Sequence, residues 1–184
     1  MKTYHINAQE LAGEAQNLRV GDRVLLTGVI YTARDAAHKR IMQAIRECLP
    51  LPFDLNGAII YFAGPTPAPQ NMAIGSCGPT TSSRMNPYTP TLMDLGLCAT
   101  IGKGERSKEV YDAIVRNKGV YLCSIGGAGA LAAQCIKSCQ VIAYEDLGCE
   151  SVKKLYVEQF PLIVAADCTG ENIFDKGKQQ YKLI

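Results

Sequence analysis

Short continuous apolar runs alternate with apolar residues spaced three or four positions apart through the second half of the chain. The continuous runs predict strands, and the spaced residues predict helices. In chain order the predicted elements are a helix at 89–95, a strand at 99–101, a helix at 107–117, a strand at 120–125, a helix at 128–138, and strands at 141–144 and 162–166. Apolar strands that alternate with helices are typical of a parallel sheet covered on both faces. We therefore predict a layered α/β fold with a mostly parallel central sheet.

The N-terminal third contains further predicted strands. Residues 24–32 form a run rich in β-branched and apolar side chains, and residues 58–62 form a short apolar run. Between them, Asp35 is expected to cap a helix that ends near Cys48, because the intervening apolar residues fall on one face. The strand-rich start of the chain predicts a second, smaller sheet.

The length and composition indicate one ordinary globular domain. The chain has 184 residues, so we expect a single domain over residues 1–184. Apolar residues make up 47% and charged residues 20%, and the net charge of +2 gives no argument for nucleic acid or an acidic membrane surface. No apolar run approaches the roughly 20 residues of a membrane helix. The start of the chain lacks the apolar core of a signal peptide, so a cytoplasmic location is expected.

The chain has eight cysteines and two histidines, His5 and His38. The cysteines are Cys48, Cys77, Cys98, Cys123, Cys135, Cys139, Cys149 and Cys168. None forms the C-x-x-C pair that usually marks a zinc or iron–sulfur site. Several lie in apolar runs, which favours buried thiols that act as small apolar side chains. Disulfides and a metal site within the chain remain alternatives.

The segment Gly-Pro-Thr-Thr-Ser-Ser-Arg-Met at 78–85 is rich in hydrogen-bond donors. It reads as a turn that opens a helix, where N–H groups, hydroxyls and a guanidinium converge, and this is the chemistry of an anion site. If the helix begins at Thr80, then Thr80 and Arg84 share one face. Helix capping by the four hydroxyl residues is the alternative.

Two more cations follow predicted strands. Arg34 comes after the strand at 24–32, and Lys103 lies between two glycines after the strand at 99–101. Ligands of open α/β sheets bind beyond the carboxyl ends of strands, so we expect Arg34, Arg84 and Lys103 to converge there. The alternatives are a surface arginine paired with a carboxylate, and a tight turn with a solvated lysine. His38 is expected to pack on its helix rather than to catalyse.

A rival motif lies at 127–132, where Gly-Ala-Gly-Ala-Leu-Ala fits the G-x-G-x-x-A pattern of dinucleotide-binding sites. Glu145 follows near the spacing of a ribose-binding acid. The alternative is close packing of a helix against a strand, which small residues permit. The dinucleotide hypothesis leaves the segment 78–85 unexplained.

Four segments carry a family resemblance. They are NGAIIYFAGPTP at 56–67, GPTTSSRM at 78–85, GKGERS at 102–107 and AYEDLG at 143–148. With these segments in order, the chain resembles the β subunit, or C-terminal domain, of iron–sulfur class I fumarases and the related L-tartrate dehydratases. The resemblance implies a three-layer swivelling β/β/α domain and a hydro-lyase that interconverts malate and fumarate. It also implies a catalytic 4Fe–4S cluster held by a partner α subunit and not ligated by this chain.

The resemblance also implies roles for four residues. Arg34 resembles a substrate-binding arginine, and Arg84 and Lys103 resemble further substrate contacts. Thr80 resembles the residue that takes the C3 proton. A threonine hydroxyl is a weak base unless nearby cations stabilise its alkoxide, and Arg84 and Lys103 are candidates for that task.

Three functions follow as hypotheses. The first is the β subunit of a two-subunit fumarate hydratase, which would form a hetero-oligomer with a cluster-bearing α subunit and take a small dicarboxylate substrate. The second is the β subunit of a dehydratase for tartrate or another hydroxy diacid. The third is a non-catalytic module that binds a nucleotide or an anion.

Overall fold

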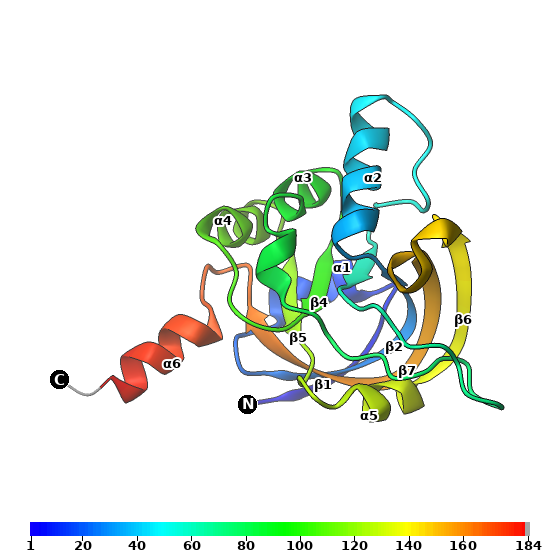
Figure 1. The fold of residues 1–184 in the computed structure, drawn as a ribbon. Helices are drawn as coiled ribbons and strands as arrows, with labels where there is room; N and C mark the ends of the chain where they lie inside the picture. Colours follow the sequence, from blue (N-terminus) through cyan, green and yellow to red (C-terminus); the bar gives the residue numbers. More distant parts are fainter. Residues whose placement is uncertain (183–184) are drawn as a thin grey trace.

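The computed structural model describes residues 1–182, and within that range the strands form one seven-stranded sheet (Figure 1). The strands are β1 (Thr3–Asn7), β2 (Arg23–Thr32), β3 (Ile59–Tyr61), β4 (Ala99–Gly102), β5 (Val120–Cys123), β6 (Ile136–Ala143) and β7 (Val152–Ala166). Successive neighbours from β1 to β5 pair in parallel, whereas β7 runs antiparallel to β2, β5 and β6. The predicted α/β fold with a mostly parallel central sheet is confirmed.

The long strand β7 closes the sheet on itself. β7 pairs with β5 along one edge and with β2 along the other, so β2, β3, β4, β5 and β7 form a ring. β1 and β6 are not part of this ring: β1 pairs with β2, and β6 pairs with β7. The prediction of a second, smaller sheet is wrong for the described residues. The ten residues of β2 are long enough to pair with β1, β3 and β7 at once, which draws the N-terminal strands into the same sheet.

Six α-helices occur in residues 1–182, and they are unevenly distributed over the sheet. They are α1 (Leu11–Glu14), α2 (Asp35–Arg46), α3 (Thr89–Asp94), α4 (Lys108–Arg116), α5 (Gly129–Cys135) and α6 (Ile173–Tyr181), with short 3-10 turns η1 (Ala15–Asn17), η2 (Ser82–Met85) and η3 (Glu145–Glu150). Figure 1 shows α2, α3 and α4 gathered on one side of the sheet and α5 on the other, while α6 projects from the body.

The strands divide the apolar side chains between two cores. Because side chains alternate across a strand, Ile59 and Tyr61 of β3 face the core inside the ring, whereas Ile60 faces the helices. Ile60 packs in a cluster that includes Ile41 of α2 and Ile114 of α4. The helices therefore fix the outer face of the parallel strands, and the loops that follow those strands are held at defined positions.

The helix predicted at 128–138 is wrong over its last three residues. α5 ends at Cys135, and residues from Ile136 onward form β6, which pairs along β7. Pairing with the long neighbouring strand overrides the local helical pattern, as tertiary context often does. The predicted strand at 141–144 is the end of β6, and that at 162–166 is the end of β7.

Asp35 does not cap α2 as predicted. Arg34 is the N-cap in extended conformation without a side-chain cap bond, and Asp35 is the first helical residue. The helix ends at Arg46, before the predicted end near Cys48, which has a positive φ of 53°. The shift of one residue at the start matters because it turns the Asp35 side chain toward neighbouring loops.

The eight cysteines are all free thiols. Cys77 and Cys98 are buried, and burial raises the pKa of each to about 12, so they act as small apolar side chains. Cys48 and Cys149 are exposed, against the expectation of burial. Within residues 1–182 no helix has both the length and the apolar character needed to cross a membrane.

Candidate active site

Arg34 lies where β2 passes into α2, with a side chain that is 21% exposed. Its guanidinium rests on Gly64, where an added Cβ would lie 2.5 Å from Nη1. Nη2 lies 3.7 Å from Oε1 of Glu150, and Nε lies 4.0 Å from Oδ2 of Asp35. Nε is buried and lacks a hydrogen-bond partner in the described residues. The guanidinium therefore lies beside two carboxylates, and its buried Nε is a donor that a ligand could use.

The segment 78–85 runs along the end of β3 rather than opening a helix at Thr80. The Thr80 N–H donates to the Phe62 carbonyl at 2.7 Å, and Pro79 bridges Ala63. The 3-10 turn η2 begins only at Ser82, and Thr81 makes no side-chain cap bond. The prediction of a helix from Thr80 is thus wrong, because Pro79 and Thr80 are engaged by the strand end.

Thr80 and Arg84 nevertheless meet. Arg84 Nη2 donates to Thr80 Oγ1, and Arg84 Nη1 lies 3.5 Å from Oδ2 of Asp35. Thr80 is half-buried, while the Arg84 side chain is 45% exposed. A hydrogen bond from a guanidinium favours the anionic form of the hydroxyl oxygen that accepts it. The arrangement suits a hydroxyl that is required to give up or take a proton.

The backbone of Lys103 lies beside the segment 78–85. Ser82 N–H donates to the Lys103 carbonyl at 2.9 Å, and Lys103 N–H donates to Ser82 Oγ at 3.0 Å. Gly102 leaves no room for a Cβ, which would overlap Ser82 Oγ, and Gly104 has a φ of +83° that suits the turn. The Lys103 side chain is exposed. In residues 1–182 no ion pair involves this ammonium within 4.0 Å.

The structure thus brings Arg34, Thr80 and Arg84 together around Asp35 and places the backbone of Lys103 against Thr81, with which it forms a bridge. Arg34 follows β2, Lys103 follows β4, and Thr80 and Arg84 lie along the end of β3. These are neighbouring strand ends at one edge of the sheet. This arrangement agrees with the expectation that ligand-binding loops lie beyond the carboxyl ends of the strands.

Two carboxylates at this edge were not predicted. Asp35 faces both arginines, and Glu150 of η3 faces Arg34. Glu150 Oε2 also accepts from the N–H of Ala36 at 2.9 Å, in the first turn of α2, where the helix dipole favours negative charge. Asp35 was interpreted as a cap, and no local pattern connects Glu150 with Arg34. Two arginines thus face two carboxylates, and the exposed Lys103 follows the neighbouring strand β4.

His38 supports the backbone of Arg34 from inside the fold. Its Nδ1 donates to the Arg34 carbonyl at 2.9 Å, and its ring stacks on Tyr88 and meets the edge of Phe62. The side chain is fully buried, and burial lowers its pKa to about 4, so the ring is neutral near pH 7. This agrees with the expectation that His38 packs rather than catalyses.

The motif at 127–132 serves packing in this fold. α5 leads into β6, which pairs antiparallel with β7, so the helix does not join two neighbouring parallel strands as a dinucleotide site requires. The Gly129 carbonyl accepts from Cys77 N–H at 3.0 Å, and a Cβ on Gly129 would lie 2.5 Å from Ser76 Oγ. Gly129 therefore permits close contact with the loop that carries Thr80.

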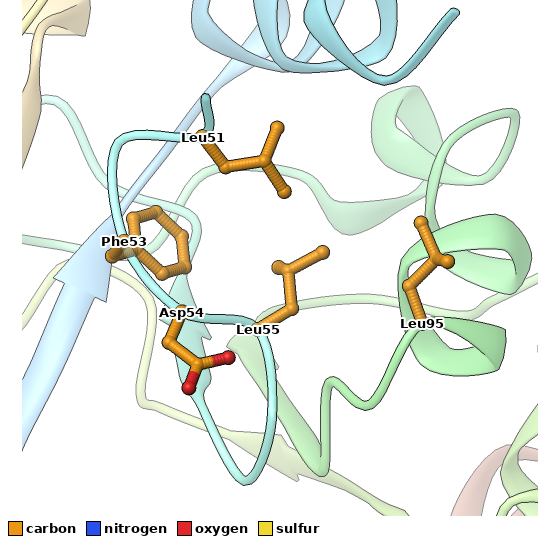
Figure 2. A pocket seen from close by; sticks show the side chains of 5 residues that line it. All are labelled: Leu51, Phe53, Asp54, Leu55 and Leu95. Carbon is orange, nitrogen blue, oxygen red and sulfur yellow. The ribbon is translucent and has the colours of Figure 1, made fainter. Parts of the chain in front are cut away.

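A pocket of about 410 Å³ lies away from this edge. Figure 2 shows its lining of Leu51, Phe53, Asp54, Leu55 and Leu95. These residues precede β3 and β4, so the pocket lies at the amino ends of the parallel strands. Four of its five lining side chains are apolar, and the fifth is an acid. Such a pocket offers nothing to a dicarboxylate, so the cationic edge is the better candidate.

Residues 1–182 contain no group of three His, Cys, Asp or Glu side chains that could hold a metal ion.

Residues 1–177 match the family described as fumarase C-terminus. The chain belongs to this family. Within the fumarase C-terminus family, it is 42% identical over 159 residues to fumarate hydratase 2 of Leishmania major, which covers 85% of this chain and 28% of that protein. It is 38% identical over 170 residues to the anaerobic class I fumarate hydratase of Escherichia coli, with 91% and 31% covered.

A third relative has nearly the same extent as this chain. The "Putative L(+)-tartrate dehydratase subunit beta" of Methanocaldococcus jannaschii is 41% identical over 178 residues, which cover 93% of this chain and 91% of that protein. By contrast, this member of the fumarase C-terminus family spans less than a third of the length of the fumarate hydratases named above.

Proposed function

We propose that this chain is the β subunit of a two-subunit iron–sulfur hydro-lyase that reversibly hydrates fumarate to L-malate. The observation that carries the proposal is the gathering of Arg34, Thr80, Arg84 and Asp35 at one edge of the sheet in a member of the fumarase C-terminus family. The match to less than a third of each fumarate hydratase supports a division in which another subunit completes the enzyme.

In this proposal the cations hold the substrate carboxylates. Arg34 grips one carboxylate with its guanidinium fork, where the unused Nε supports an additional hydrogen bond. Arg84 and Lys103 provide further contacts. Charged hydrogen bonds of this kind contribute about 1.5–3 kcal/mol each. Because the substrate brings two negative charges, three cations opposite two carboxylates give a favourable balance.

Thr80 is the proposed base: its alkoxide takes the proton from C3 of malate and becomes a hydroxyl. Loss of this proton leaves an electron pair that delocalises into the adjacent carboxylate, and departure of hydroxide from C2 completes the double bond. The hydrogen bond from Arg84 Nη2 to Thr80 Oγ1 stabilises negative charge on that oxygen. Fixed cations also stabilise the doubly charged carboxylate that develops in the transition state.

The hydroxide leaves from C2, and a Lewis acid is the usual aid for such a step. We propose that a 4Fe–4S cluster on a partner α subunit supplies this chemistry when bound. The described residues of this chain offer no ligand set for it. We further propose that residues 1–184 form one domain of the three-layer swivelling β/β/α type, in which the cationic edge faces the partner.

A dehydratase for tartrate is the second candidate. The observation that favours it is the M. jannaschii protein, whose name specifies the β subunit of such an enzyme and whose length this chain almost matches. Malate and tartrate share two carboxylates and a hydroxyl, so the cationic edge suits either. Discrimination then depends on contacts to the second hydroxyl of tartrate.

The test is anaerobic co-purification with a cluster-bearing partner subunit, followed by assays with malate, fumarate and tartrate. Turnover of malate and fumarate by the complex, with neither subunit active alone, is the expected result. Preferential turnover of tartrate would select the second candidate. A chain that binds no such partner would contradict both.

A further inference from the structure

Arg106 is a buried arginine that has no role in the function proposed above. It follows the Lys103–Gly104 turn and is only 4% exposed. Its guanidinium lies over the rings of Phe62 and Tyr121, at 5.2 and 5.1 Å from their centroids. A charged group this deep in a fold needs a physical explanation.

The partners of Arg106 are all neutral. Nε donates to Asn86 Oδ1 at 2.7 Å, Nη1 to Thr100 Oγ1 at 3.2 Å, and Nη2 to Thr89 Oγ1 at 2.7 Å. No Asp or Glu forms an ion pair with this guanidinium in residues 1–182, and no acid is among the groups that shift its pKa. Each of the three nitrogens donates one hydrogen bond, but in residues 1–182 the charge has no counter-ion.

A buried charge without a counter-ion is costly to maintain. Burial lowers the pKa of Arg106 to about 10, and the group still carries its full charge near pH 7. The nearby His38 adds no charge there, because burial keeps its ring neutral. An apolar side chain would fill the same space without this cost, so the positive charge itself is the feature to explain.

The groups around Arg106 also hold the candidate site. The ring of Phe62 lies under the guanidinium, and the backbone carbonyl of Phe62 accepts the N–H of Thr80. Tyr121, the second ring, bonds through its hydroxyl to Ser82 Oγ at 2.9 Å and to the Gly104 carbonyl at 2.8 Å. Arg106 therefore contacts two aromatic residues that also bond to the loops of Thr80 and Lys103. Buried charges at that depth are weakly screened by salt.

We infer that Arg106 is a positioning residue whose uncompensated positive charge strengthens the binding of a dianion at the cationic edge. The inference rests on the proposed function, since it takes the dicarboxylate to be the ligand. Arg106 does not touch the substrate. It acts through the electrostatic field that its charge sets up at the loops of Thr80 and Lys103.

The sharpest test gives Arg106 a counter-ion and leaves its hydrogen bonds in place. The variant Asn86→Asp keeps the shape and the acceptor at Nε but neutralises the local charge. In the complex with the partner subunit, we expect the inhibition constant of succinate, an unreactive dicarboxylate, to rise about tenfold. The melting temperature should stay the same or rise, because a buried cation gains a partner. The control Gln179→Glu, on the projecting helix α6, makes the same change in net charge and should leave succinate binding unchanged.

Two substitutions of Arg106 separate charge from hydrogen-bond geometry. Arg106→Gln removes the charge and should weaken succinate about as much as Asn86→Asp, whereas Arg106→Lys should stay within about threefold of the wild type. Unchanged succinate binding in Asn86→Asp would overturn the inference, and so would equal losses in the Gln and Lys variants. If Arg106→Gln does not fold, Asn86→Asp and Arg106→Lys decide. Failure of the proposed function itself would be seen in the wild-type complex, which would then neither turn over malate nor bind succinate.

Discussion

Oδ2 of Asp35 lies 3.5 Å from Nη1 of Arg84, so a carboxylate at the start of α2 faces an arginine from the loop between β3 and α3. The same oxygen lies 4.0 Å from Nε of Arg34. Asp35 thereby orders two arginines at once. It also reduces the positive charge that the substrate meets, so its two effects on substrate binding oppose each other.

Asp35→Asn should separate these effects. Without the carboxylate, Arg84 loses the group that aligns it with Thr80, and we expect kcat to fall about tenfold. The KM should change by less than about threefold, because the increased positive charge offsets the loss of order. Steady-state kinetics of the assembled complex measure both values. An increase in KM with an unchanged kcat would show that Asp35 acts on binding alone.

Thr80→Ala should abolish proton transfer while the substrate still binds. The expected loss in kcat is at least about 100-fold, which is the scale of a missing general base. Succinate inhibition should be nearly unchanged, since Arg34, Arg84 and Lys103 remain. Thr80→Ser, which keeps the hydroxyl, is the matched control and should retain most of the activity. Near-normal turnover in the alanine variant would remove Thr80 from the mechanism.

Gly64→Ala should displace the guanidinium of Arg34. The new Cβ would lie 2.5 Å from Nη1, at the end of a flexible side chain, so the side chain moves and the fold persists. Loss of one charged hydrogen bond predicts a rise of about tenfold in the succinate inhibition constant. Gly13→Ala, where a Cβ meets nothing within 4 Å, is the control and should bind succinate normally. Unaltered binding in Gly64→Ala would contradict the assigned position of Arg34.

Stability should depend on pH through His38. Its pKa is lowered from 6.5 to about 4 by burial, so the unfolded chain binds the proton more tightly than the folded one. The contribution of the neutral ring is therefore complete above pH 6.5 and is lost as the pH falls toward 4. The loss amounts to about 3 kcal/mol at most.

Urea unfolding of the chain at pH 7 and pH 4.5 measures this loss. The variant His38→Gln keeps a polar side chain that does not titrate, and its unfolding free energy should fall less over the same interval. Equal pH dependence in the two proteins would place the titrating group elsewhere.

The sequence predicts that Arg34 and Lys103 follow strands, and the structure has them after β2 and β4. Arg84 lies in η2, well after β3, and its contact with Asp35 depends on how this loop packs. The carboxyl ends of neighbouring parallel strands meet at one edge, so Arg34, Arg84 and Lys103 were expected to lie there. Their roles in binding and proton transfer stay predictions. Glu150 could not be foreseen, since its contact with Arg34 depends on the packing of η3 against α2 and on no local pattern.

The closure of the sheet could not be predicted from the sequence either. A strand with two partners reads like any other apolar run, so the 15-residue strand β7 was predicted only over its last third. The segment that became β6 has a weak helical pattern of its own. Only the presence of β7 beside it decides its conformation.

The pairing of β2 with β7 also bears on how the protein is made. β7 follows β2 in the chain only after four other strands, so the ring closes only once β7 has emerged from the ribosome. Contacts this far apart slow folding, and before they form, the exposed edges of β2 and β5 are open to wrong partners. A nascent chain that stops before β7 would therefore present an incomplete ring, and chaperone protection during synthesis should matter most for this final step.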